Sequence, residues 1–114
     1  MIKIKTTYSG EVNLYIQILN YYNNNLCIRL LMEDGSPFAT LTKNLDGDKS
    51  EIPSTCAYVD INNCPFAEEM IKKYDLGEMR FTQGCGIYKT SGFVTYPLYA
   101  FNMAKLLEHQ KPVS

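Results

Sequence analysis

The segment SGFVTYPLYAF, residues 91–101, is the stretch on which the predicted fold depends. It carries four aromatic residues together with one glycine and one proline. Aromatic residues favour strands, where successive side chains point to opposite faces. Pro97 has no N–H to give to a ladder, so an edge position or a bend is expected there. We therefore predict a bent, largely buried strand, covered by earlier strands and by two short glycine-containing segments.

Four segments before residue 46 alternate apolar and polar residues, which is the pattern of half-buried strands. Residues 2–7 carry lysines between isoleucines and are predicted as an edge strand. Residues 38–45 follow the turn signal DGSP and complete a three-stranded meander. In the two strands between them, the apolar side chains share one parity: Val12, Leu14, Ile16 and Ile18, then Leu26, Ile28, Leu30 and Met32.

One main helix is predicted after residue 62. Asn63 or Cys64 is expected to cap it, since short polar side chains can accept the first free N–H groups, and Gly77 is expected to close it. A short second helix is predicted at residues 103–109. Residues 1–114 thus form a single α+β domain: an antiparallel sheet of about five or six strands, packed by one main helix and a short C-terminal helix.

The charge and length of the chain exclude some classes of function. Eleven basic and twelve acidic residues leave a net charge of −1 over 114 residues. Because phosphate contacts supply most of the affinity for nucleic acid, a protein without a basic patch is not expected to bind it directly. No stretch has the roughly 18 to 20 apolar residues of a membrane helix, and the N-terminus lacks the apolar region of a secretory signal. We expect a cytoplasmic protein with reduced thiols and no membrane partner.

From residue 58 onward the order of motifs is distinctive. YVDINNCPF leads into the helix, LGE ends it and SGFV-x-YPLY-x-F follows, with FATLTKNL earlier in the chain. Over residues 26–101 the sequence resembles a small domain family of unknown function carried by phages and conjugative elements of gut bacteria. The resemblance implies a mobile-element origin and an α+β fold, and it transfers no catalytic or ligand residue. Small phage proteins without enzymatic motifs often bind a host protein, and anti-CRISPR and anti-restriction proteins are examples.

A zinc-stabilised domain is one alternative. The candidate ligands are Cys27, Cys56, Cys64, Cys85 and His109. Zinc requires four ligands in tetrahedral geometry, usually with a C-x₂₋₄-C pair on a turn. No such pair is present, so the thiols are more simply explained as small buried apolar groups. No other cofactor is expected.

A cysteine hydrolase is a more distant alternative. Cys85 lies between two glycines, where backbone N–H groups could point at an oxyanion, and His109 is the single histidine available as a base. A catalytic pair must meet within hydrogen-bonding distance. Nothing in the sequence brings these two residues together, so we expect a protein without enzymatic activity.

The tyrosines give the clearest residue signal. The chain has nine tyrosines and no tryptophan. Tyrosine combines a large rigid area with a polar end and is enriched at protein interfaces. The candidate partner-binding residues are Tyr21, Tyr22, Tyr88, Tyr96 and Tyr99. The leading hypothesis is a non-enzymatic module that binds a host protein, such as a defence nuclease; a homodimer through an exposed strand edge remains open.

Overall fold

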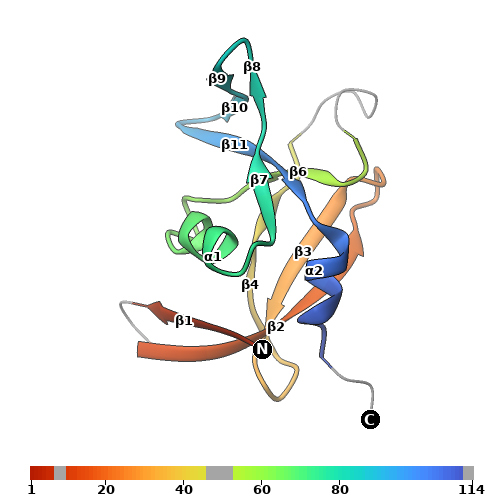
Figure 1. Cartoon of the computed structure of the whole chain (residues 1–114), viewed down its shortest axis with the longest axis vertical. Helices are drawn as coiled ribbons and strands as arrows, with labels where there is room; N and C mark the ends of the chain where they lie inside the picture. The colour runs from red at the N-terminus through yellow and green to blue at the C-terminus, as the bar shows by residue number, and fades with distance from the viewer. Residues whose placement is uncertain (7–9, 46–52, 112–114) are drawn as a thin grey trace.

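The computed structural model describes residues 1–6, 10–45 and 53–111, which form eleven strands and two short helices (Figure 1). In chain order the strands are β1 (Ile2–Thr6), β2 (Gly10–Asn20), β3 (Leu26–Leu31), β4 (Pro37–Thr40), β5 (Thr42–Lys43), β6 (Cys56–Val59), β7 (Gly77–Met79), β8 (Phe81–Thr82), β9 (Cys85–Gly86), β10 (Tyr88–Ser91) and β11 (Val94–Phe101). The helices are α1 (Ala67–Lys73) and α2 (Met103–Glu108). In this described part of the chain, neither helix has the length and apolar character needed to cross a membrane.

The strands divide into two larger sheets and one two-stranded ribbon. The first sheet has the order β1-β2-β3-β4, and the second has the order β10-β11-β6-β5, with β7 also paired to β11. Strands β8 and β9 form the ribbon. All ladders between these strands are antiparallel, which agrees with the predicted α+β class. The prediction of one sheet of five or six strands is wrong, because β11 pairs with β10, β6 and β7 and so forms a second sheet.

Strand β11 is the centre of the second sheet. It pairs with β10 through its first half, and with β6 and β7 through its second half. The prediction of a largely buried strand at this place is confirmed for Val94–Phe101, and the strand continues through Pro97 without a break. The expected edge position holds on the β6 side alone, where Pro97 has no partner strand. Pro97 lies opposite Tyr88 in the ladder with β10, and β6 begins to pair only at the next residue, Leu98. The missing N–H therefore removes no bond from the ladder with β10.

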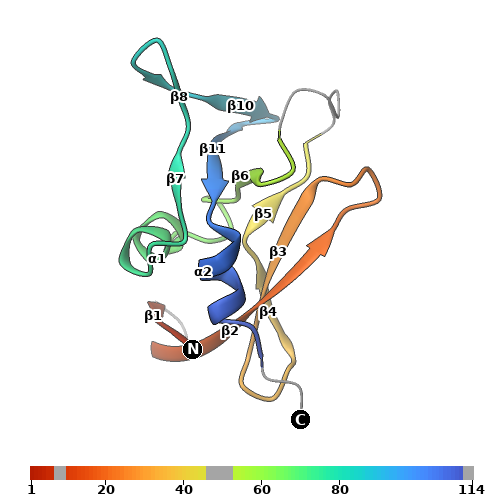
Figure 2. The ribbon, with the colours of Figure 1, turned by 45° about the vertical axis from the view of Figure 1, so that its right-hand side comes forward.

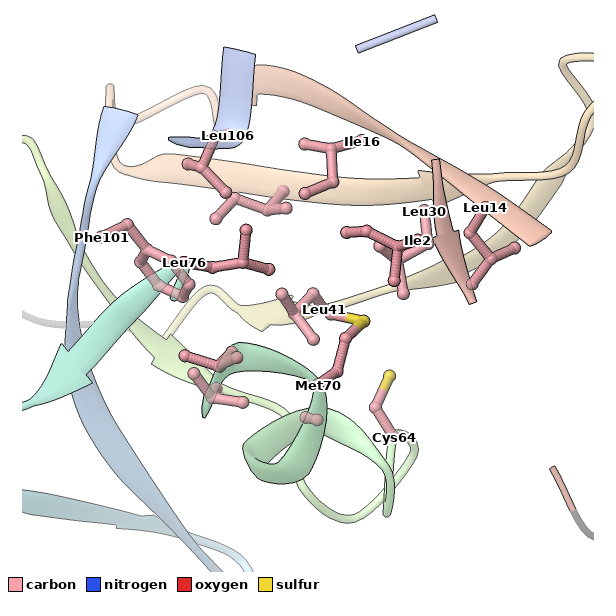
Figure 3. Packing of buried hydrophobic residues seen from close by; sticks show 14 of the residues in the cluster. Ile2, Leu14, Ile16, Leu30, Leu41, Cys64, Met70, Leu76, Phe101 and Leu106 are labelled. Carbon is pink, nitrogen blue, oxygen red and sulfur yellow. The ribbon is translucent and has the colours of Figure 1, made fainter. Parts of the chain in front are cut away.

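The core lies between the first sheet, α1, α2 and the end of β11 (Figure 3). Strands β2 and β3 bury the alternate apolar side chains predicted from the sequence. Those almost fully buried are Leu14, Ile16, Ile28 and Leu30. Leu41, between β4 and β5, reaches toward α1 in the middle of the cluster. The alternation in β2 and β3 thus predicted the inward faces correctly.

Helix α1 is shorter than predicted, and both of its predicted ends were wrong. Its N-cap is Phe66, which provides no side-chain cap. The backbone N–H of Asn63 is bonded to Asp60 at 3.1 Å, in the turn before the helix. After the helix, the left-handed residue is Asp75, with φ 54°. Gly77 instead starts β7, where a Cβ atom would lie 3.0 Å from the Cα of Phe101 and closer still to the preceding carbonyl oxygen. Gly77 is thus required by close strand packing and not by the helix end.

Candidate protein-binding arm

The segment from β8 to the start of β11 projects from the body of the molecule. We call residues 81–93 the arm; it comprises β8, β9, β10 and the turn into β11. Figures 1 and 2 both show it at one end of the long axis, away from β1 and β2. The molecule measures 40 × 29 × 24 Å along its principal axes, and the arm accounts for part of the longest one.

Two tight turns shape the arm. In the first, Thr82 pairs with Cys85, and the two residues between them, Gln83 and Gly84, have φ values of 51° and 81°. Positive φ at both loop positions defines a type I′ hairpin turn, whose twist matches that of the strands. In the second turn Gly92, with φ 63°, is the first of two loop residues and Phe93 the second. This second turn leaves Phe93 outside the ladder at the end of the hairpin.

A closed ring of backbone hydrogen bonds holds the base of the arm. Arg80 donates its N–H to the carbonyl of Leu98, Leu98 donates to Ile87, and Ile87 donates to Arg80, each at 2.9 Å. These residues belong to the three chain segments that meet where β7 passes into β8 and β9 passes into β10. Because each residue is both donor and acceptor, both ends of the ribbon are fixed to the central strand.

One face of the arm is aromatic. Directly opposed residues in an antiparallel ladder present their side chains on the same face. Phe81 is opposite Gly86, and a Cβ atom on that glycine would lie 2.9 Å from the ring of Tyr88 and 3.0 Å from the end of Met79. The side chains of Phe81, Tyr88 and Met79 therefore gather on one side, over Pro97, which is fully buried. Glycine at position 86 leaves the space that the ring of Tyr88 occupies.

Three large aromatic side chains of the arm are exposed. The exposed fraction is 61% for Phe81, 53% for Tyr88 and 108% for Phe93. With about 200 Å² per ring, they offer roughly 400 Å² of apolar surface. These rings are available to contact another molecule, because most of their surface is not packed in the core.

The same face continues inward to α1. Tyr99 lies two residues beyond Pro97 on β11, and its hydroxyl donates a 2.5 Å hydrogen bond to a carboxylate oxygen of Glu68. Burial raises the pKa of Tyr99 above its usual value, and the hydrogen bond to Glu68 raises it further. Helix α1 thus covers the inner half of this face, while the outer half remains on the surface.

The five candidate tyrosines do not form one surface. Tyr96 and Tyr99 are buried, with exposed fractions of 5% and 7%, which corrects the expectation that they take part in a contact surface. Tyr21 is half-buried, and its hydroxyl lies 3.1 Å and 3.0 Å from the carbonyl and side-chain oxygens of Thr42. Burial raises the pKa of Tyr21 to about 12. These three tyrosines join parts of the fold.

Two candidate tyrosines remain on the surface, in different places. Tyr22 is 86% exposed in the turn between β2 and β3, whereas Tyr88 belongs to the arm. Both views place that turn on the opposite side of the molecule from the β8–β9 ribbon. Tyr22 is therefore a natural control position for any test of the arm.

The candidate zinc ligands are dispersed. Cys27, Cys56 and Cys64 are buried, and Cys85 is exposed on the arm. Burial, followed by the charge of Asp60, raises the pKa of the Cys64 thiol to about 11, so this thiol stays protonated at neutral pH. Within residues 1–6, 10–45 and 53–111, no three His, Cys, Asp or Glu side chains are grouped to hold a metal ion.

His109 lies at the C-terminal cap of α2, with its ring edge-on to Tyr74 at 5.4 Å between centroids. Its Nδ1 atom is buried and has no hydrogen-bond partner in the described part of the chain. Burial lowers the pKa of His109, as does the nearby N-terminal charge. Figures 1 and 2 show α2 far from β9, so the structure does not bring His109 to Cys85.

Sequence reasoning missed two exposed residues of the arm, Phe81 and Phe93. The strand predicted over residues 91–101 includes Phe93, but in the structure Phe93 follows Gly92 as a loop residue of a tight turn. Phe81 precedes Thr82, Gln83 and Gly84, so a hairpin turn was the available signal. A single phenylalanine beside a turn signal does not by itself reveal exposure.

These observations define a small α+β domain whose most prominent surface feature is a projecting aromatic arm. The chain belongs to the family described as Domain of unknown function (DUF4313), whose model matches residues 15–112. The matched range includes the arm and leaves out β1. The expected resemblance to a domain family of unknown function is confirmed at that level. No curated protein and no solved structure matched the chain.

Proposed function

We propose that this protein is a non-enzymatic protein-binding module that uses its arm to engage a host protein. The observation that carries the proposal is the exposure of Phe81, Tyr88 and Phe93 on one projecting, tightly turned segment. Aromatic residues dominate the few positions that supply most of the energy of protein interfaces. Tight turns and a fixed base reduce the entropy that such a surface loses on binding.

The size of the arm surface indicates how it acts. Burying roughly 400 Å² of apolar surface stabilises a complex by roughly 10 kcal/mol before costs. Association itself costs about 4–15 kcal/mol in lost motion. The rings can therefore anchor a partner, but a stable complex requires further contacts beside them.

We further propose that the partner belongs to a bacterial host and that the protein comes from a phage or another mobile element and acts in the host cytoplasm. The sequence resemblance described above supports this origin, by analogy with small proteins that bind host defence nucleases. The net charge of −1 favours inhibition by contact with the nuclease protein over competition for its nucleic acid. The first partner to test is thus a CRISPR or restriction nuclease.

Site-specific photo-crosslinking tests the proposal. A photoreactive phenylalanine analogue replaces Phe93 in one preparation and Tyr22 in a matched control, because both positions are highly exposed and lie on different parts of the molecule. Each protein is expressed in a gut bacterium that carries defence nucleases, irradiated and recovered for identification of crosslinked proteins. We expect one host protein to crosslink from position 93 and not from position 22.

The identified partner is then purified and its DNA cleavage is measured with and without the protein. Inhibition by the wild-type protein is expected, with loss of inhibition in Phe81→Ser/Phe93→Ser and retention in Tyr22→Ser. Absence of a position-specific crosslink in hosts with a full set of defence nucleases would count against a protein-binding role for the arm. A crosslinked partner without nuclease activity would redirect only the proposed target.

A further inference from the structure

Strand β10 has a free edge. It is the last strand of the second sheet and, within the described residues, it pairs with β11 alone. The opposed pair Tyr88–Pro97 cannot exchange two hydrogen bonds, because Pro97 has no N–H. In an antiparallel ladder, hydrogen-bonded and non-hydrogen-bonded pairs alternate. The bonded pairs are therefore Lys89–Tyr96 and Ser91–Val94, and the main-chain N–H and C=O groups of Tyr88 and Thr90 point away from β11.

The usual protections of a free edge are few here. Edge strands are commonly blocked by proline, a bulge or charged side chains. Strand β10 contains no proline, and its register with β11 is regular over all four residues. Its one charged residue, Lys89, directs its main chain to β11 and its side chain to the face opposite Tyr88. As far as the described residues show, the outer edge of β10 thus remains open to a new strand.

We propose that β10 accepts an extended strand of the partner, whose main chain pairs with Tyr88 and Thr90 and whose alternate apolar side chains pack on the aromatic face. This inference rests on the proposed function. A strand added to an edge lies about 4.8 Å away, and its side chains on the same face come within about 5.5 Å of their neighbours. An apolar residue opposite Tyr88 therefore contacts this ring. The strand supplies the further contacts that the rings alone lack.

In the register that uses both outward residues of β10 in each copy, a second copy of this chain fits the edge less well than a different protein. Pairing through Tyr88 and Thr90 of both copies, antiparallel, aligns Tyr88 with Thr90 of the other copy and vice versa. That register sets Lys89 directly opposite its own equivalent, and like charges in this position destabilise a ladder. The geometry therefore favours a partner strand that is apolar at alternate positions and free of basic residues opposite Lys89.

A display selection tests the inference without a known partner. Random linear peptides of about twelve residues, long enough to span an edge strand, are selected on immobilised wild-type protein. Enriched peptides are measured against Thr90→Pro, which removes the outward N–H, and against Thr90→Val, which keeps it. Both variants lose the 2.9 Å contact between the hydroxyls of Thr90 and Thr95, so this loss is matched. We expect alternating apolar peptides whose affinity falls at least about tenfold in Thr90→Pro and less than about twofold in Thr90→Val.

Amide hydrogen exchange keeps the test decisive if Thr90→Pro does not fold. Added peptide should protect the amides of Tyr88 and Thr90 in the wild-type protein, because these two point to the free edge. Peptides that bind without protecting them, or that bind Thr90→Pro as tightly as Thr90→Val, would overturn strand addition. So would a selection that enriches no peptide. None of these results changes the crosslinking outcome at position 93, so the proposed function stands or falls separately.

Discussion

Replacing Gly77 with alanine tests how β7 is held against the central strand. A Cβ atom at this position would lie 3.0 Å from the Cα of Phe101 and 3.2 Å from the carbonyl carbon of Ala100, and closest to the oxygen of that carbonyl. All of these atoms belong to the backbone of β11, which is also paired to β6 and β10 and cannot move freely. Relief must come from β7, which moves away from β11 and disturbs the packing of the fully buried Leu76.

The expected loss can be estimated. Overpacking in a well-packed region costs about 1–3 kcal/mol. The lower entropy of the unfolded alanine variant offsets about 0.4–1 kcal/mol of this. We expect a net loss of about 2 kcal/mol, seen as a melting temperature lower by about 10 °C. Urea unfolding followed by circular dichroism, with unchanged slope, measures the change directly.

Asp75→Gly provides the complementary measurement. Asp75 has φ 54°, a conformation that glycine adopts without steric penalty. This variant should therefore keep or gain stability, by up to about 1 kcal/mol. An unchanged Gly77→Ala protein together with a destabilised Asp75→Gly protein would refute the packing argument.

Three further predictions concern two tyrosines, His109 and the binding of zinc. Folding raises the pKa of Tyr99, and it raises the pKa of Tyr21 to about 12. The free energy of unfolding should therefore decline as pH rises above 10, because the tyrosines of the unfolded chain lose their protons first. Absorbance titration of the tyrosines and unfolding measurements across this pH range check the prediction. The lowered pKa of His109 means that the unfolded chain binds this proton more readily, so stability should fall below about pH 6.5, and less steeply in His109→Gln. Since no metal-holding group occurs in the described residues, elemental analysis should find far less than one zinc per chain, and a chelator should leave the melting temperature unchanged.

Local patterns in the sequence predicted the first sheet well. Alternation fixes which side chains of β2 and β3 face inward, and this periodicity needs no knowledge of the rest of the chain. The division into two sheets could not be read in this way. It depends on β11 pairing with β6 and β7, which are distant in sequence, as well as with its hairpin partner β10. Pro97 is tolerated because β6 pairs with β11 only from Leu98 onward.

The arm shows the same limit for the candidate site. The surplus of tyrosines indicated a contact surface, yet Tyr96 and Tyr99 are buried on opposite faces of β11, and the hydroxyl of Tyr99 is bonded to Glu68 of α1. Exposure of Phe81 and Phe93 follows from two tight turns, whose positive φ values can be recognised only once the strand register is known. Residue type thus indicated the chemistry of the surface, and non-local pairing decided which residues form it.

The role of the arm in contact is tested most directly by measuring folding and binding in one variant, Phe81→Ser/Tyr88→Ser/Phe93→Ser. The side chains are half or more exposed, so the free energy of unfolding should fall by less than about 2 kcal/mol. Affinity for the crosslinked partner should fall at least about 100-fold, as expected when aromatic anchors of an interface are removed. Wild-type affinity in a folded variant, or unfolding of the variant before binding can be measured, would contradict a surface made for contact.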